Sequence, residues 1–560
     1  MGLSLVALDT DHIKGYVFAT DKLKEIRGAS SILDRLNRWE MEKVAGKLQA
    51  RSIYTNGGAG LFVVDADKAQ AFKLRIQELY REKSKGRASI TGVIQELPDD
   101  APDDIEALMR YNLKRPLDLM RYRLRVEKDS PPDVIAPPSH PFMRPCDSCG
   151  TDYAEHVQPE PGGRDTFYCA SCLEKQEEDG WIKSRISDTV RRIIKGEWVR
   201  GDDMWGRILR YLQNVDYSFP DDPNDIGRLD RPDDFNEFSQ FAETKDYLGL
   251  IYADANNMGA ESEKQGTLRD LKDFATGVDG AIHQAMSQAI KRYLPIARIR
   301  RDGETIPVFP FDILLLGGDD VVMVTDAAKA MHVALAIAQE FRSLTKNKYD
   351  LSVGVVLAPI KYPFGLLQDL AESALKFAKK DGARAKDGDK TRINFFKLTG
   401  GSEPDFKDVY NELYHRKDEQ KGEPEFYATL RPYTVQNLRL LLDLLAEGRK
   451  MNLGRTKLHQ LREAVLEKNL TTSVQQALAA LLNWRGEQRF YVAEQIYEFG
   501  QRAQVPRSNP RDPLKGFPRV TFPWFADGKS DEGRDVYRTS LLDFIELYDL
   551  VTREGEDSGD

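Results

Sequence analysis

The sequence predicts an α+β protein with two related sheet domains, a metal-binding segment between them and a helical C-terminal region. Three observations support this fold class. Residues 247–380 read as strands and helices in the order β-α-β-β-α-β-α, and a similar order recurs near the N-terminus. All four cysteines also fall within one short window between these two regions.

Length and composition are those of a multidomain globular protein. The chain has 560 residues, and a prior of roughly 150 residues per domain suggests about three to five domains. No apolar run approaches the ~20 residues that cross a bilayer, and the apolar run at the N-terminus is too short for a signal peptide. We therefore expect a cytoplasmic protein with no membrane partner. The net charge of −9 does not indicate nucleic-acid binding, although basic stretches can act locally.

The central region contains the most informative motif. Tyr247–Ala253 reads as a buried strand that ends at Asp254, and a β-hairpin follows with Gly317-Gly318-Asp319-Asp320 at its tip. In a ferredoxin-like split-βαβ sheet, the end of the first strand lies beside the hairpin turn. We therefore expect Asp254 and Asp319 to meet at one edge of the sheet.

Residue types at this edge indicate metal and phosphate chemistry. Two converging carboxylates provide the hard oxygen ligands that suit Mg²⁺ or Mn²⁺. Gly317 and Gly318 carry no side chains, so a triphosphate can lie against their backbone. The central region is therefore predicted to bind a nucleotide through a divalent metal.

The N-terminal region repeats the pattern without the acidic pair. A strand over Leu3–Leu8 ends at Asp9-Thr10-Asp11, and a second strand leads into Gly57-Gly58-Ala59-Gly60. Matching the two glycine pairs places Ala59 and Gly60 where the central region has its acidic pair, and it matches Gly92 to Gly354. The first unit is thus predicted to keep a phosphate-compatible turn, Gly57 and Gly58, while lacking the hairpin metal ligands.

The four cysteines form two C-x-x-C pairs separated by 19 residues. Paired knuckles at this separation are typical of tetrahedral Zn²⁺, whereas a disulfide pair would be reduced in the cytoplasm. Four thiolates leave no open coordination position, so we expect a structural zinc site. Its predicted ligands are Cys146, Cys149, Cys169 and Cys172.

With these motifs in place, the sequence resembles the large, polymerase-like subunit of type III CRISPR effector complexes. The matching pieces are Ala253–Gly259, the Gly317–Asp320 turn, the degenerate first unit, the interposed cysteines and Lys24–Ser31. The resemblance implies two nucleotide cyclase-like palm domains that face each other with ATP at their interface. It also implies partner CRISPR subunits and synthesis of cyclic oligoadenylate when guide RNA pairs with target RNA. The predicted domains are a degenerate first palm (1–125), a zinc-ribbon segment (126–180), a helical linker region (181–245), a catalytic second palm (246–400) and a C-terminal helical bundle (401–560).

Two features depart from the family pattern. Many members begin with a metal-dependent HD nuclease domain, whereas this chain starts at the first palm and none of its seven histidines precedes an aspartate. DNA cleavage by this polypeptide is therefore not expected. Asn256 also stands where many relatives have a second aspartate. If its side chain contacts a metal or nucleotide, substrate preference can differ.

The implied reaction joins the 3′-hydroxyl of one ATP to the α-phosphate of another and releases pyrophosphate at two metals ~3.5–4 Å apart. Asp254 and Asp319 are the expected metal ligands, and Asp320 is expected to assist. Lys379 matches the lysine that clamps triphosphate in related palms, although an exposed helix lysine is the alternative. Asp9 and Asp11 are expected either to orient the second nucleotide or to cap structure. Further nucleotide contacts are predicted at Ala255, Asn256, Asn257, Gly317, Gly318, Gly57 and Gly58.

The C-terminal region has the apolar periodicity of a helical bundle, for example at Leu438, Leu441, Leu442 and Leu445. By resemblance this bundle adjoins the small subunits along guide and target RNA, and Arg449–Arg462 is predicted to contact RNA or a partner subunit. Two other functions remain open. One is a nucleotidyltransferase with a different adenylate product, such as a small-molecule conjugate or a linear oligonucleotide. The other is a non-catalytic RNA-binding scaffold.

Overall fold

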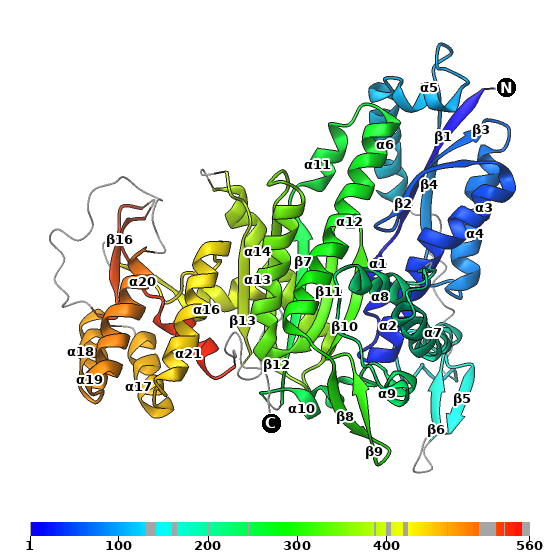
Figure 1. Cartoon of the computed structure of the whole chain (residues 1–560). Helices are drawn as coiled ribbons and strands as arrows, with labels where there is room; N and C mark the ends of the chain where they lie inside the picture. The colour runs from blue at the N-terminus through cyan, green and yellow to red at the C-terminus, as the bar shows by residue number, and fades with distance from the viewer. Residues whose placement is uncertain are drawn as a thin grey trace.

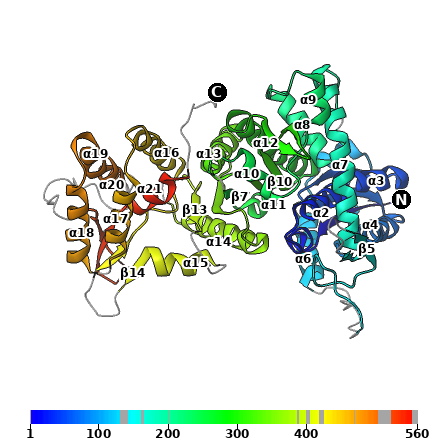
Figure 2. The same ribbon diagram turned by 90° about the horizontal axis from the view of Figure 1, so that it is seen from below.

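The computed structural model contains two sheets side by side and a separate C-terminal region (Figure 1). Figure 2 shows the second sheet between the first sheet and the C-terminal region. The structure describes residues 2–129, 142–159, 165–199, 201–244, 246–385, 388–398, 405–417, 424–467, 469–502, 522–530 and 532–550.

The first sheet has the strand order β2-β3-β1-β4, and all its pairs are antiparallel. This is the ferredoxin-like order predicted from the sequence. Strand β1 is apolar on both faces because its alternate residues enter two different cores. Val6 and Leu8 pack with helices α2 and α4, whereas Leu5 and Ala7 pack with α6. The elements are β1 (Leu3–Thr10), α1 (Ile13–Val17), α2 (Leu23–Arg35), α3 (Met41–Leu48), β2 (Arg51–Asn56), β3 (Ala59–Asp65), α4 (Ala69–Lys83), β4 (Ile90–Glu96), α5 (Ile105–Arg110) and α6 (Lys114–Asp129).

The second sheet repeats this topology with one added strand, in the order β10-β11-β7-β12-β13. Strand β13 joins parallel to β12, and the other pairs are antiparallel. Asp326, the last residue of β11, caps α13 by accepting a hydrogen bond from the Ala328 backbone N–H. The elements are β7 (Tyr247–Ala255), α11 (Met258–Glu263), α12 (Leu268–Tyr293), β10 (Phe311–Gly317), β11 (Asp320–Asp326), α13 (Ala327–Leu344), β12 (Leu351–Pro359), α14 (Phe364–Ala383) and β13 (Ile393–Lys397).

The segment between the sheets is dominated by the long helix α7, which packs directly on α2. A Cβ atom added at Gly28 would lie 1.7 Å from the Lys175 carbonyl oxygen, so only glycine permits this backbone approach. The segment also contains β5 (His156–Pro159), β6 (Asp165–Tyr168), α7 (Ala170–Ile194), α8 (Met204–Asn214), α9 (Pro223–Arg228) and α10 (Phe238–Phe241). A hairpin inserted into the second sheet domain, β8 (Ala297–Arg301) with β9 (Glu304–Val308), lies against this segment.

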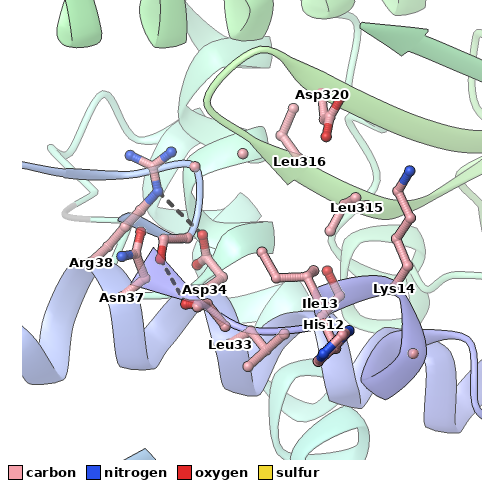
Figure 3. Close-up of a pocket in the computed structure, with 16 residues that line it drawn as sticks. His12, Ile13, Lys14, Leu33, Asp34, Asn37, Arg38, Leu315, Leu316 and Asp320 are labelled. Atoms are coloured by element: carbon pink, nitrogen blue, oxygen red, sulfur yellow. Dashed lines mark hydrogen bonds and ion pairs between the residues drawn. The ribbon is translucent and has the colours of Figure 1, made fainter. Parts of the chain in front are cut away.

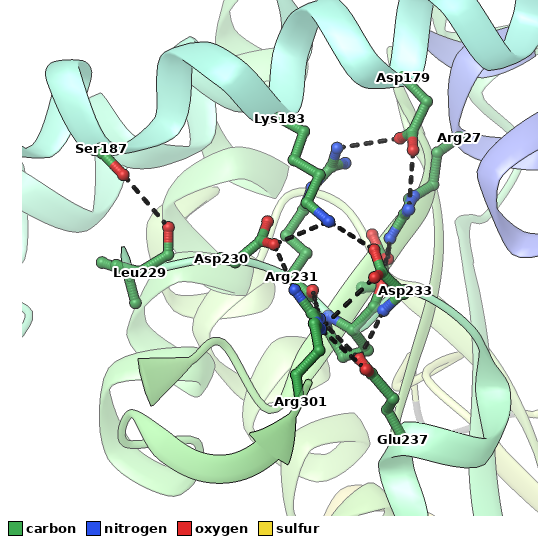
Figure 4. Close-up of polar contacts among 12 residues, drawn as sticks. Arg27, Asp179, Lys183, Ser187, Leu229, Asp230, Arg231, Asp233, Glu237 and Arg301 are labelled. Atoms are coloured by element: carbon green, nitrogen blue, oxygen red, sulfur yellow. Dashed lines mark hydrogen bonds and ion pairs between the residues drawn. The ribbon is translucent and has the colours of Figure 1, made fainter. Parts of the chain in front are cut away.

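A buried ion network joins the two sheets through α7 (Figure 4). Arg27 of α2 donates to Asp312 of β10 at 2.7 Å and to Asp179 of α7 at 2.8 Å. Arg231 donates to the other oxygen of Asp179 at 2.9 Å. All four side chains are nearly inaccessible to solvent. Removing one member would leave an uncompensated buried charge, which costs about 3–5 kcal/mol, so this network fixes the position of β10 relative to the first sheet.

The C-terminal region is helical, as predicted, and the four leucines named above are buried in it. It also contains a small sheet, β14-β15-β17-β16, that the sequence did not predict. The elements are α15 (Phe406–Val409), β14 (His415–Lys417), β15 (Glu425–Tyr427), α16 (Val435–Lys450), α17 (Arg455–Leu466), α18 (Leu470–Leu482), α19 (Gly486–Phe490), α20 (Tyr497–Arg502), β16 (Phe525–Lys529), β17 (Asp535–Arg538) and α21 (Leu541–Tyr548).

These observations confirm the predicted fold class, with the small C-terminal sheet as an addition. The exact domain boundaries stay a prediction. Across the residues described, no helix combines the length and the apolar character that a membrane span requires.

Candidate functional site

The hairpin turns of the two sheets meet at the interface. A Cβ atom added at Gly318 would lie 3.0 Å from the Cα of Gly57, and one added at Gly57 would lie 3.1 Å from the Cα of Gly318. Both residues have positive φ, 60° at Gly57 and 64° at Gly318. Their lack of a side chain therefore serves the tight turn and the close approach of the two sheets, in addition to any contact with phosphate.

Strand register corrects the predicted match between the two turns by one residue. Asn56 pairs with Ala59 in the first hairpin, and Gly317 pairs with Asp320 in the second. Gly58 therefore occupies the position of Asp319, and Ala59 that of Asp320. The match from sequence was wrong because it aligned the two glycine pairs. Gly57 and Gly58 both lie at the tip of the first hairpin, whereas only Gly318 of the second pair lies at the tip of its hairpin.

The same correction applies to the neighbouring strands. Gly92 lies opposite Leu8, whereas Val353 lies opposite Ala253, so Gly92 corresponds to Val353 and not to Gly354. Asp9 and Asp254 occupy equivalent positions on β1 and β7. The first sheet thus has one acidic position in common with the second and lacks both hairpin carboxylates.

In the second sheet the carboxylates come together. Asp254 lies directly opposite Asp320 in the β7–β11 ladder, so both side chains point to the same face. Like charges in opposite positions repel each other, so a nearby cation stabilises the pair. Burial, and then the charge of Asp254, raise the pKa of Asp319 to about 7. Burial, and then the charges of Asp254 and Asp319, raise the pKa of Asp320 well above its ordinary value.

Lys379 of α14 supplies one cation to this group. Its Nζ forms an ion pair with Asp254 and lies 3.4 Å from the Ala255 carbonyl oxygen. One carboxylate oxygen of Asp320 is nevertheless buried without a hydrogen-bond partner. A buried acceptor with no donor is costly, and a metal ion or a bound ligand would satisfy it.

These donors fit a divalent cation of the Mg²⁺ or Mn²⁺ type. Asp254, Asp319 and the Ala255 carbonyl are hard oxygen ligands, as such ions prefer. Within the described part of the chain, the one group of three or more acidic, histidine or cysteine ligands whose atoms lie within 4.8 Å of one another is the cysteine cluster. The aspartates are therefore neighbours without forming a closed three-carboxylate cage.

Two cavities flank the contact between the turns. One, the Asp320 cavity, has a volume of about 390 Å³, and Figure 3 shows its walls. They include Lys14, Asn37 and Arg38 from the first sheet and Leu315, Gly317 and Asp320 from the second. The other, the Asp319 cavity, has a volume of about 480 Å³ and includes Asp9, Arg121, Lys128, Gly318 and Asp319. Gly57 borders both, so the turn contact separates them.

Asp9 has a lysine partner as Asp254 does. Lys128 Nζ lies 2.5 Å from Asp9 and 3.8 Å from Asp11. Lys128 belongs to α6, which comes after β4, the fourth strand of the first sheet. Lys379 belongs to α14, which follows β12, the fourth strand of the second sheet along the chain. Burial raises the pKa of Asp9 despite the hydrogen bond from Lys128. Asp11 accepts hydrogen bonds from Ser89 and Thr91.

The two asparagines after Asp254 shape the start of α11. Asn256 donates from its side chain to the Lys390 carbonyl at 3.1 Å, and its side-chain oxygen is buried without a partner. Asn257 has a φ of 62° and immediately precedes α11, a left-handed conformation that asparagine tolerates better than most residues. Their predicted contacts with nucleotide remain predictions.

Sequence reasoning missed the ion pairs that cross the interface. Arg38 lies beside Asp34 of its own sheet domain and donates to Asp279 of α12 at 3.1 Å. Asp279 in turn accepts a hydrogen bond from the Gly318 backbone N–H at 3.3 Å. No local pattern marks Arg38 and Asp279, because each is one charged residue in a helix and the two lie 241 positions apart.

The four cysteines form a compact cluster that can hold a metal ion. Cys149 Sγ lies 3.9 Å from Cys169 Sγ, close to the about 3.8 Å that tetrahedral bonds of ~2.3 Å require. Gly150 has a φ of 66°, as a tight turn after the first pair requires. The cluster is attached to the first sheet domain, since Ser148 donates to Glu25 and Lys22 donates to Tyr168 at 2.9 Å.

A paired-sheet fold with carboxylates at the strand end and hairpin defines a nucleotidyltransferase- or cyclase-like palm protein. Comparison with protein families supports this class, because residues 247–387 match the model of the Cas10/Cmr2 second palm domain. These residues are a second palm of the Cas10/Cmr2 family, which confirms the resemblance seen in the sequence. We call the first and second sheet domains the first and second palm.

Solved structures agree at the level of fold. A Csm1–Csm4 cassette in complex with one ATP is 13% identical with a TM-score of 0.50, covering 86% of this chain and 65% of its own. The cassette in complex with pppApApA is 13% identical with a TM-score of 0.50, covering 87% and 65%. Csm1 in T. onnurineus is 14% identical with a TM-score of 0.49, covering 86% and 64%. The chain thus spans less than two thirds of these relatives, and it matches no curated protein.

Proposed function

We propose that the chain synthesises cyclic oligoadenylate from ATP at the interface of its two palms. The observation that carries this proposal is the pairing of Asp254 with Asp320, beside Asp319, against a turn of the first palm that has no carboxylate. Such an arrangement would place a metal-binding centre of the second palm opposite the hairpin turn of the first palm, at one interface. Two nucleotides can then meet there, one held by each palm.

The second palm would hold the divalent metal through Asp254, Asp319 and the Ala255 carbonyl. When bound, the metal would lower the pKa of the attacking 3′-hydroxyl and offset the negative charge of the leaving group. Lys379 is placed to bind the triphosphate, because its ammonium already lies between Asp254 and the Ala255 carbonyl. Asp320 would assist from the opposite strand.

The cavities support the binding of two nucleotides. Each lies within the range of about 300–1,000 Å³ that is usual for small-molecule sites, and each has walls from both palms. The Asp319 cavity adds Arg121 and Lys128, which are cations suited to phosphate. Asp9 would orient a nucleotide there through Lys128, whereas the bonds of Asp11 to Ser89 and Thr91 favour a structural role.

We further propose that the chain acts as the large subunit of a type III CRISPR ribonucleoprotein. The similar cassettes contain a Csm4 partner and ATP or a short oligoadenylate, and we extend both kinds of ligand to this chain. A guide–target RNA duplex would activate it. Within Arg449–Arg462, Arg449 donates to the Tyr548 carbonyl, so packing already occupies it. Arg455 is 80% exposed beside Asp549 and is the better candidate for contact with RNA or a partner.

The test is incubation of the assembled complex with labelled ATP, Mg²⁺ or Mn²⁺ and guide-complementary RNA, followed by mass spectrometry. A cyclic adenylate that requires the RNA would support the proposal. A linear or conjugated adenylate would redirect it to another nucleotidyltransferase reaction. No adenylated product with either metal would leave a scaffold role, and the Asp319→Ala, Asp320→Ala double variant provides the inactive control.

A further inference from the structure

Lys14 reaches from the first palm into the second. It lies on α1, directly after the loop that follows β1, and its Nζ is 3.0 Å from Glu372 of α14. The same Nζ lies 5.0 Å from the ring centroid of Tyr252, which is on β7, the strand that carries Asp254. Figure 3 shows the side chain extending from the first palm toward the hairpin strand that carries Asp320. Its ammonium is therefore a charge that one palm presents to the acidic centre of the other.

The partners of Lys14 allow it to move. Its side chain is 42% exposed, and an ion pair in such a setting contributes little to stability. Glu372 has a second cation, Lys376, at 2.8 Å, so it keeps a partner if Lys14 leaves. Arg38, which lines the same cavity, lies between Asp34 and Asp279 and is not comparably available.

A nucleotide in the Asp320 cavity would require an additional cation. Lys379 already forms an ion pair with Asp254, and a triphosphate adds further negative charge beside Asp320 in a partly enclosed space. Attraction between opposite charges is stronger in such a space than in water. Among the residues that line this cavity, Lys14 supplies the ammonium group.

We propose that Lys14 is a catalytic residue supplied by the first palm, whose ammonium leaves Glu372 and binds the phosphates of the nucleotide held at Asp320. The proposal rests on the proposed function, because it presumes a nucleoside triphosphate in the second palm. It gives the first palm a chemical role in the second palm's site. Nucleotide affinity then depends on the two palms being in contact, so any event that changes their contact changes binding.

The test is calorimetric titration of the full chain with ATP and Mg²⁺, without RNA so that turnover is not required. Lys14→Gln is expected to weaken ATP binding about tenfold or more, the usual effect of losing a hydrogen bond between charged groups. Lys14→Arg should keep affinity within about threefold, because the charge is retained. Lys47→Gln, an exposed lysine of α3, is the matched control and should leave affinity unchanged.

Adenosine separates phosphate binding from a structural effect. It has the base and ribose of ATP without phosphates, so Lys14→Gln should leave its affinity unchanged while that of ATP falls. Equal losses for both ligands would show that Lys14 only holds the palms together and would overturn the proposal. Unchanged ATP affinity in Lys14→Gln would overturn it as well.

Glu372→Gln supplies the complementary variant. Removing the competing carboxylate should tighten ATP binding by about two- to fivefold when Lys14 is present and have no effect in the Lys14→Gln background. Equal effects in both backgrounds would contradict transfer of Lys14 to the nucleotide. A chain that binds ATP through Lys14 and yet makes no adenylate would refute the proposed function and leave this inference intact.

Discussion

The two palms share a topology and differ at the hairpin tip. Both present an aspartate at the end of the first strand, Asp9 or Asp254, and both pair it with a lysine from a helix that comes after the fourth strand. Only the second palm adds Asp319 and Asp320, whereas the first has Gly58 and Ala59 there. The hairpin pair is therefore the feature that distinguishes the palm with a candidate metal centre.

The first palm nevertheless contributes to the shared site. Gly57 sets the closest approach of the two turns, Lys14 points at the second palm, and Arg38 holds Asp279 beside Gly318. Each contact would be lost if the first palm were removed. A palm without metal ligands can therefore be retained because it completes the wall of a site on its neighbour.

Matched substitutions at the two strand ends give the largest expected contrast. Asp254→Asn should reduce adenylate synthesis by more than about 100-fold, because it removes a proposed ligand of the metal. Asp9→Asn should reduce it by less than about fivefold, since the first palm's hairpin has Gly58 and Ala59 and offers no carboxylate beside Asp9 to hold a metal. Initial rates in the RNA-activated complex measure both. Similar losses in the two variants would mean that the first palm also contributes a ligand.

Removal of zinc from the cysteine site tests whether that site stabilises the first palm more than the second. A four-thiolate zinc site contributes directly to folding, and its contacts from Ser148 to Glu25 and from Tyr168 to Lys22 reach the first palm. Chelation should release about one Zn²⁺ per chain and increase hydrogen exchange in α2 and the start of α7. Strands β7 and β12 should change less. Equal deprotection of both palms, or no release of zinc, would contradict this expectation.

The sequence was informative where chemistry is local and uninformative where it is not. The Gly317–Asp320 turn, the Asp254 strand end and the two cysteine pairs each lie within a few residues, so periodicity and spacing locate them. Lys14 meets Glu372 only after two sheets have packed, and one lysine in a five-residue helix carries no signal for that contact. The one-residue error at Gly58 arose because strand register depends on hydrogen bonding between strands that composition does not show.

The small C-terminal sheet was missed for a related reason. Its strands β14 and β15 have three residues each, too few to show alternation of apolar and polar residues. Their neighbour β17 comes more than 100 positions later, beyond the helices that dominate the periodicity of the region. Short strands joined by distant pairing are therefore visible only in the folded chain.

The contact between the turns should be sensitive to a single methyl group. Gly57→Ala forces a residue with a side chain into a left-handed conformation and places its Cβ 3.1 Å from the Gly318 backbone. Gly86→Ala is the matched control, since Gly86 also has positive φ but no atom within 4 Å of an added Cβ. Each should lose about 1–2 kcal/mol of unfolding free energy from the conformational cost. Only Gly57→Ala should also lower synthesis, by about tenfold, and equal rates in the two variants would show that the turn contact is unimportant.

The smallest expected effect tests whether a hairpin carboxylate opposite the strand-end aspartate lowers the free energy of unfolding. Ala59 lies directly opposite Asp9, as Asp320 lies opposite Asp254. Ala59→Asp should therefore lower the unfolding free energy by about 0.5–1 kcal/mol relative to Ala59→Asn, which has the same size and no charge. Denaturant unfolding at neutral pH measures the difference. Millimolar Mg²⁺ should reduce this difference, because a cation between the two carboxylates removes their repulsion. Equal unfolding free energies for Ala59→Asp and Ala59→Asn without Mg²⁺ would show that Lys128 alone offsets a second charge at this strand end.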